Sequence, residues 1–225
     1  MAAAAQVSEA SEQQVRLLAA DATGLLKALA PPKKDVVAKA RTQDREKRIV
    51  AMTVWQDQLF CGTADGHVEV YEDCNPSQMS IFLTDLEGLV DLDVNESYVA
   101  VALQKGQVKV YNHDGLEQED FTAHTHVNCL RLSREKPSLL AVGGEKADLR
   151  VWDLDDIKQP KWRAKNVKND KFNLQVPIDI RGIRWVNATQ LITVSAHRHV
   201  RLYDTSEKAR PLYSVQFNDA ALSAV

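Results

Sequence analysis

Leu149-Arg150-Val151-Trp152-Asp153-Leu154 is the stretch of sequence that decides the fold. Apolar and polar side chains alternate along it, which is the period of a β-strand with one buried face. The strand ends in an aromatic residue that is followed by an acid. The same phrase returns, with small changes, at residues 68–73, 108–112 and 200–204.

The spacing of these four copies indicates the architecture. Their aromatic residues are Tyr71, Tyr111, Trp152 and Tyr203, so successive copies lie 40, 41 and 51 positions apart. A period of roughly 40–45 residues with a strand ending in Trp-Asp is typical of propeller blades of four strands. We therefore predict an all-β propeller in which each aromatic ends the third strand of its sheet. A β-sandwich would also explain many short strands, but not a fixed period.

The rest of the chain is arranged around this period. Residues 1–14 are rich in Ala, Ser, Gln and Glu and are expected to form a disordered tail, and the propeller is expected to fill residues 15–225. A first hairpin is predicted with strands at 15–20 and 25–29. Four full repeats follow from residue 49, and a fifth is predicted to begin at Pro211. Because the chain stops at Val225, within that repeat, we expect it to cover about four to five blades.

A basic run at residues 33–48 carries seven Lys or Arg against three acids. It has two interpretations: a solvated loop or short surface helix, or a segment for nuclear import or phosphate contact. The whole chain has a net charge of -3 and a pI of about 6.1, so nucleic-acid binding would have to come from a local patch.

Cysteine usage and hydropathy limit the cellular setting. The three cysteines, Cys61, Cys74 and Cys129, are odd in number and scattered, which favours reduced thiols and an intracellular protein. No apolar run approaches the ~18 residues of a membrane span. We therefore expect no membrane association.

The histidines are the main candidates for metal or catalytic chemistry. His124 and His126 form one i, i+2 pair, and His197 and His199 form another, but no further ligands follow at a suitable spacing. We interpret both pairs as structural. No phosphate loop, dinucleotide fingerprint or nucleophile elbow occurs. The sequence thus predicts no enzyme, no cofactor and no small-molecule substrate.

The fourth repeat contains an insertion of about ten residues, between Trp162 and Pro177. Residues 159–172 hold five Lys or Arg against one acid, together with asparagine amides and two aromatic residues. Such a composition suits phosphates and unstacked bases, or an acidic protein surface. A longer solvated loop is the plainer alternative. The residues that we expect to contact a partner are Arg163, Lys165, Asn166, Lys168, Asn169, Asp170 and Lys171.

The insertion also carries a family resemblance. Residues 163–170, with Val176-Pro177 after them and the Trp152-Asp153 strand before them, resemble the signature of the WD-repeat ribosome-assembly factors of the nucleolus. The later 200–204 strand and Arg210-Pro211 fit as well. The resemblance is specific over residues 141–211, and only the propeller period extends it to the rest.

The resemblance implies more than the residues do by themselves. It implies a seven-bladed propeller in the nucleus and nucleolus, bound to the pre-60S ribosomal particle with its pre-rRNA and assembly proteins. It implies a part in pre-rRNA processing and release by an AAA-type ATPase. The alternative is a generic WD-repeat adaptor, for example in ubiquitin ligation or signalling, which would need only protein partners.

Overall fold

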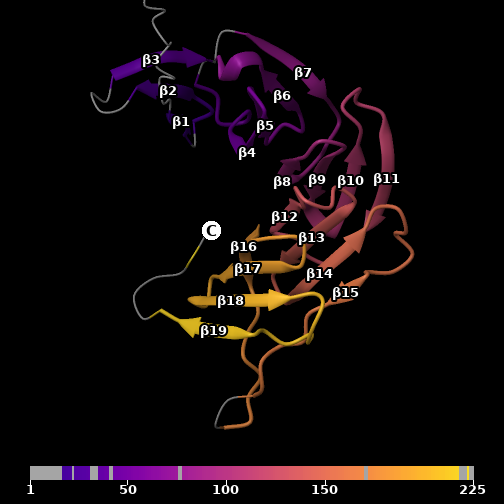
Figure 1. Ribbon diagram of the computed structural model, residues 1–225. Coiled ribbons are helices and arrows are strands. Elements are labelled where there is room, and N and C mark those ends of the chain that lie inside the picture. The colour runs from indigo at the N-terminus through magenta and orange to yellow at the C-terminus, as the bar shows by residue number, and fades with distance from the viewer. Residues whose placement is uncertain are drawn as a thin grey trace, which may run out of the picture.

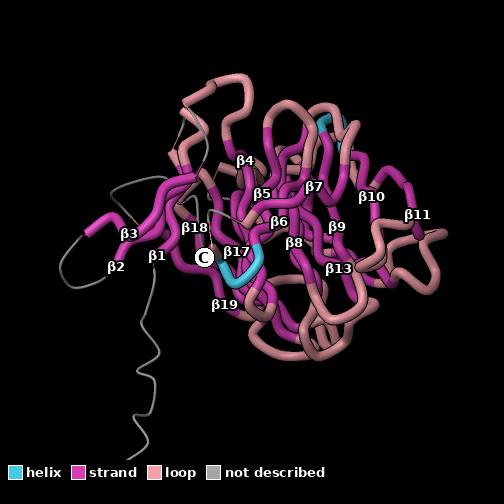
Figure 2. The backbone as a smooth tube through the Cα atoms, turned by 90° about the horizontal axis from the view of Figure 1, so that it is seen from above, coloured by secondary structure: helices cyan, strands magenta, loops and turns pink. Residues whose placement is uncertain are grey.

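The computed structural model describes residues 17–21, 23–30, 35–40, 43–75, 78–169, 172–217 and 222. Strands dominate this part of the chain, joined by loops and two single-turn 3-10 segments, η1 (Glu72–Cys74) and η2 (Gln104–Gly106) (Figure 2). The described elements form one three-stranded sheet and four four-stranded sheets, all antiparallel between neighbours. The predicted all-β class is confirmed.

The sheets follow one another in chain order along an open arc (Figure 1). The first sheet contains β1 (Leu17–Ala20), β2 (Leu26–Ala30) and β3 (Asp35–Ala40). The four-stranded sheets, which we call sheets B to E, have the strands in sequence order. Their bounds are as follows: sheet B, β4 (Ile49–Trp55), β5 (Gln58–Thr63), β6 (Val68–Tyr71) and β7 (Met79–Leu83); sheet C, β8 (Leu89–Val94), β9 (Val99–Leu103), β10 (Gln107–Tyr111) and β11 (Glu117–Thr122); sheet D, β12 (Cys129–Leu132), β13 (Leu139–Gly144), β14 (Ala147–Asp153) and β15 (Trp162–Arg163); sheet E, β16 (Ile180–Trp185), β17 (Gln190–Ser195), β18 (His199–Asp204) and β19 (Tyr213–Gln216).

The repeated aromatic residues occupy equivalent places, as predicted. Each lies at or next to the end of the third strand of its sheet, on β6, β10, β14 and β18. Each also faces a residue of the second strand that lies 12 positions earlier in the chain: Leu59 pairs with Tyr71, Val99 with Tyr111, Leu140 with Trp152, and Leu191 with Tyr203. The register of the four sheets is therefore the same at this point.

The hydrophobic core lies between successive sheets rather than within one layer. Phe60 and Val70 of sheet B pack in one cluster with Leu92 and Val101 of sheet C. Corresponding clusters join sheets C and D, and sheets D and E. A smaller cluster joins Leu26 of the first sheet to sheet B. Since both faces of the inner sheets are covered, strands such as β9 are buried along their whole length.

The structure corrects the prediction for residues 35–40, within the basic run, and for the fifth repeat. Residues 35–40 form strand β3 rather than a loop or helix, because alternate backbone groups pair with β2 whatever the charge of the side chains. Strand β19 does not begin a new repeat. It pairs with β18 as the outer strand of sheet E. The predicted tail at 1–14 lies outside the described residues.

The four-strand blade predicts an outer strand in each sheet, but the sequence pattern does not locate β7 and β11. Their side chains are mostly exposed, and β11 has the sequence Glu-Gln-Glu-Asp-Phe-Thr, which lacks an alternating apolar face. The predicted first hairpin is present in the described residues, with its turn at residues 21–25 and its strands at 17–20 and 26–30. No helix in the described part of the chain has the length and apolar character to cross a membrane.

Candidate functional site

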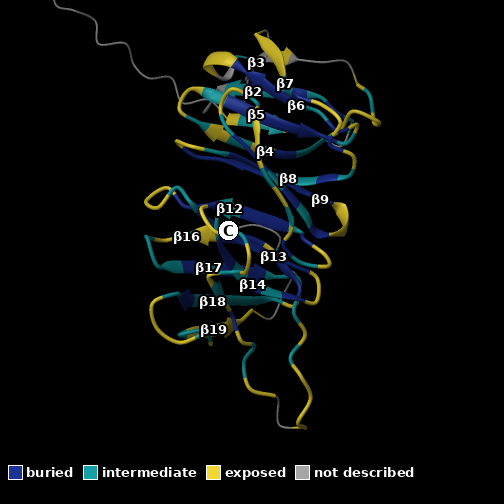
Figure 3. Ribbon diagram, turned by 90° about the vertical axis from the view of Figure 1, so that its right-hand side faces the viewer, coloured by how far each residue is buried: buried dark blue, intermediate teal, exposed yellow. Residues whose placement is uncertain are grey.

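The insertion leaves sheet D at the end of β15 and projects away from the body before the chain enters β16 (Figures 1 and 3). Strand β15 is only two residues long, and Arg163 pairs with Arg150 of β14. The next residue, Ala164, is buried, and its amide donates to the Leu149 carbonyl at 2.8 Å. The loop therefore starts from a fixed point on the sheet.

Asn166 closes the neck of this loop. Its Nδ2 donates to the carbonyl oxygen of Val176 at 2.6 Å, which ties the outgoing arm to the returning arm. Its Oδ1 accepts from the amide of Val167 at 2.9 Å and from Nη1 of Arg201 at 3.1 Å. Arg201 lies on β18 and is only 7% exposed. The neck is thus joined to sheet E as well as to itself.

A second set of contacts holds the returning arm. The amide of Lys146 donates to the carbonyl of Ile178 at 2.9 Å. The buried Asp179 carboxylate accepts from Arg181 at 2.8 Å and from Nδ2 of Asn128 at 2.9 Å. The arms are therefore ordered at the base, where they join β14, β16 and β18.

Three described cations of the insertion are exposed and lack a described partner. Arg163, Lys165 and Lys168 are exposed, and their side chains make no hydrogen bond or ion pair with any residue that the structure describes. Other cations of the same sheet behave differently, since Lys161 pairs with Asp153 at 2.6 Å. Burial, and next the positive charge of Arg163, lower the pKa of Arg150.

The predicted site residues therefore divide into three groups. Arg163, Lys165 and Lys168 are available for contact. Asn166 is engaged in the neck, and Asn169 donates to Asn173 within the loop at 3.0 and 3.1 Å to Oδ1 and the carbonyl oxygen. Asp170 and Lys171 lie outside the described residues. Phe172, at the start of the returning arm, is 71% exposed.

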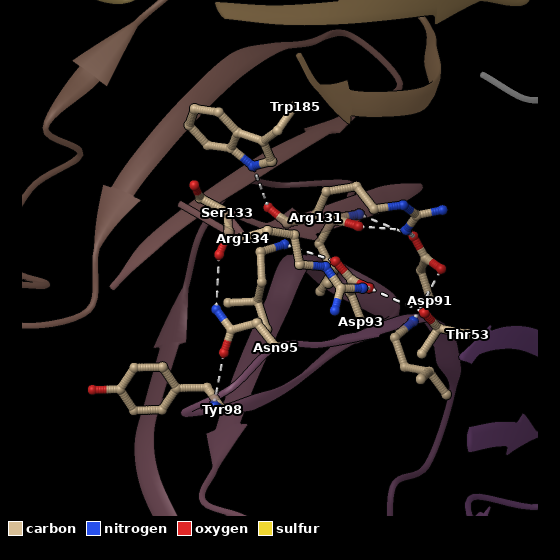
Figure 4. Close-up of polar contacts among 12 residues, drawn as sticks. Thr53, Asp91, Asp93, Asn95, Tyr98, Arg131, Ser133, Arg134 and Trp185 are labelled. Atoms are coloured by element: carbon tan, nitrogen blue, oxygen red, sulfur yellow. Dashed lines mark hydrogen bonds and ion pairs between the residues drawn. The ribbon is translucent and has the colours of Figure 1, made fainter. Parts of the chain in front are cut away.

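Sequence reasoning missed the polar network on the inner strands. Asp91 and Asp93 lie on β8, and their carboxylates accept from the backbone amides of Leu130 and Leu132 on β12, at 3.0 and 2.9 Å (Figure 4). These amides lie on the free edge of β12, where no described strand pairs with them. The carboxylates satisfy donors that would otherwise be left unpaired on a sheet edge.

Arginine completes this network. Nη1 of Arg131 donates to Asp91 at 2.6 Å, and the carbonyl oxygen of Arg131 accepts from Nε1 of Trp185 at 3.0 Å. Burial raises the pKa of both Asp91 and Asp93, and the charge of Arg131 opposes that rise. The sequence feature that indicates this network is the pair of acids, Asp91 and Asp93, at alternate positions of a buried strand.

The histidine pairs are in different settings. Nδ1 of His124 accepts from the amide of Thr125 at 2.8 Å, and burial lowers the pKa of His124 to about 4. His199 is half-buried, and burial lowers its pKa as well. Across the described residues, no three His, Cys, Asp or Glu side chains gather where a metal ion could be held.

Comparison with known proteins adds names to this architecture. No protein-family model matches the chain. WD repeat-containing protein 74 of Bos taurus is 27% identical over 90% of this chain and 56% of its own length. The Homo sapiens protein of the same name is 35% identical over 43% of this chain and 26% of its own. Ribosome biogenesis protein NSA1 of Meyerozyma guilliermondii is 28% identical over 75% of this chain and 49% of its own length.

The fold first defines a class: the chain is an all-β protein of successive four-stranded antiparallel sheets, and its WD-repeat relatives fit a β-propeller. The relatives that match most of its length then support its placement in the WD-repeat ribosome-assembly family. The chain spans about half the length of these curated relatives.

Proposed function

We propose that this chain is a non-catalytic WD-repeat scaffold of ribosome biogenesis and that its insertion contacts the pre-60S particle. The names of the relatives support the process. The observation that supports the site is that Arg163 and Lys165, just before the neck at Asn166, and Lys168, beyond it, are exposed cations without a described partner on an otherwise acidic chain.

Phosphate is the chemistry that these cations suit best. Arg163, Lys165 and Lys168 extend along one arm of the loop, so they can meet successive phosphates of pre-rRNA. The exposed ring of Phe172 adds a flat face on which an unstacked base can rest. A pre-ordered neck limits the entropy that is lost when the loop binds.

The proposal also includes the wider setting of the family. We place the protein in the nucleolus, with a part in pre-rRNA processing and with release from the particle by an AAA-type ATPase. These three points depend on the family resemblance rather than on a contact in the structure. Activity would come from binding and positioning, with no step of covalent chemistry on this chain.

The test is co-sedimentation of the tagged chain with large-subunit precursors. Replacing Arg163, Lys165 and Lys168 by Ala should weaken association and leave the melting temperature nearly unchanged, because exposed substitutions usually cost within about 0.5 kcal/mol. The salt dependence of RNA binding should also fall, by about 0.7–0.9 in logarithmic slope for each phosphate that the variant no longer neutralises.

The matched control removes three cations elsewhere. Lys47, Lys136 and Lys158 are exposed, and their side chains make no hydrogen bond or ion pair with the described residues. Their replacement by Ala changes net charge equally and should leave association intact. Equal loss in both triple variants would show a non-specific charge effect. Recovery of a ubiquitin ligase without pre-rRNA would favour the adaptor alternative instead.

A further inference from the structure

One position of the repeat lines the axial side of the arc. In each of sheets B to E this position lies on the first strand, which is β4, β8, β12 or β16. The first-strand partners of Leu59, Val99, Leu140 and Leu191 are known from the register, and the position is the residue that comes just before each partner. These four second-strand residues are themselves equivalent, because each pairs with a repeated aromatic. The residues at the axial position are Thr53, Asp93, Arg131 and Arg184.

All four side chains line a single hollow of about 270 Å³. It lies where β4, β8, β12 and β16 come together, and Leu132, Ile183 and Trp185 supply the smaller, apolar part of its wall. The hollow therefore combines an apolar surface with charged groups at one repeated height.

Three of the four axial residues have partners (Figure 4). Thr53 donates through Oγ1 to Asp93 Oδ1 at 3.2 Å. Asp93 also lies 3.6 Å from Nη2 of Arg134, whose guanidinium stacks 4.6 Å from the centre of the Trp55 ring. Arg131 pairs with Asp91. These contacts fix the guanidinium groups in place before any ligand arrives.

Arg184 is the exception among the axial residues. Its side chain is exposed and makes no hydrogen bond or ion pair with the described part of the chain. The hollow and its ion-pair partners hold three guanidinium groups, of Arg131, Arg134 and Arg184, against the two carboxylates of Asp91 and Asp93, so one positive charge remains there. That charge belongs to Arg184.

We propose that the axial hollow binds a side-chain carboxylate of an acidic peptide segment from a partner protein, and that Arg184 pairs with this carboxylate. A single excess charge beside an apolar wall matches one carboxylate on an extended chain. Nucleic-acid backbone would instead require a row of cations, such as the one on the insertion. The site is independent of the insertion and of the function proposed for it.

The experiment measures fluorescence anisotropy of a labelled polyglutamate peptide with the full chain. Arg184→Ala should weaken binding about tenfold, the scale of one missing charge-assisted hydrogen bond. Arg184→Glu should weaken it further, and Arg184→Lys should retain part of it. Lys47→Glu is the control: it makes the same change of charge on the exposed loop before β4, does not touch the lining of the hollow, and should leave polyglutamate affinity unchanged.

Two results would overturn the proposal. One is an affinity for polyglutamate that Arg184→Ala leaves unchanged, or that Lys47→Glu lowers as much as Arg184→Glu does. The other concerns labelled polyuridine RNA. If Arg184→Ala lowers the affinity for that RNA as much as the affinity for the peptide, the hollow is an unselective anion site. Because the Arg184 side chain bonds to none of the described residues, every variant should keep the parent melting temperature, and the comparison remains one of folded proteins.

Discussion

Arg201 donates from Nη1 to Oδ1 of Asn166 at 3.1 Å, across 35 positions of sequence and between two sheets. Arg201 is almost completely buried, while Asn166 stands at the base of an exposed loop. The contact makes the projecting insertion part of the same ordered unit as sheets D and E. It also assigns Asn166 a role in positioning the loop.

We expect Asn166→Ala to lower the free energy of unfolding by about 1–3 kcal/mol, because the buried Arg201 guanidinium loses one of its acceptors and the neck loses its tie to Val176. Chemical denaturation measures this change. Asn169→Ala is the matched control, since Asn169 is exposed and, among the described residues, its side chain bonds only to Asn173 within the loop. It should cost within about 0.5 kcal/mol. Equal effects of the two substitutions would contradict the assigned role.

Asp91→Ala should destabilise the protein by about 3 kcal/mol. The substitution leaves the amide of Leu130 without an acceptor and Arg131 without its ion pair. Thermal and denaturant unfolding give the value. Asp155→Ala, an exposed acid on the loop after β14, is the control and should change stability little. A small loss for Asp91→Ala would mean that water replaces the carboxylate at the edge of β12.

Two glycines with the same backbone conformation should differ in their tolerance of Ala. Gly106 has φ +83 and Gly115 has φ +78, so Ala at either position carries the left-handed penalty of about 1–2 kcal/mol. A Cβ at Gly106 would also overlap the carbonyl oxygen of His124, whereas at Gly115 the nearest atom is 3.7 Å away. Gly106→Ala should therefore be clearly the more destabilising in denaturation experiments, and similar losses would show that the backbone shifts freely.

Stability should depend on pH through His124. Burial holds its pKa at about 4 in the folded state, below the value of 6.5 for an unperturbed histidine. Between these values the unfolded chain binds more protons, so stability is fully present above pH 6.5 and falls as the pH drops toward 4. His124→Gln should flatten this part of the curve when melting temperature is measured against pH. An unchanged slope would assign the effect to other groups.

The sequence predicted what is local and repeated. An alternating strand that ends in Tyr71 or Trp152 carries its own pattern, so four third strands and their neighbours could be placed correctly. Strand β11 could not, because an exposed outer strand needs no apolar face. The contact between Asp91 and Arg131 also could not be predicted from the sequence. It joins residues 40 positions apart, and only the packing of sheet on sheet brings these residues together.

The tie between Asn166 and Val176 makes the segment beyond it a natural place for grafting. A loop that is closed at its neck can be lengthened at small cost, about 0.6 kcal/mol for each doubling of its length. A fluorophore or photo-crosslinking residue placed between positions 167 and 175 would lie outside every inter-sheet core cluster. The insertion is therefore a point at which neighbours of the protein can be labelled inside an intact assembly without disturbing the sheets that carry it.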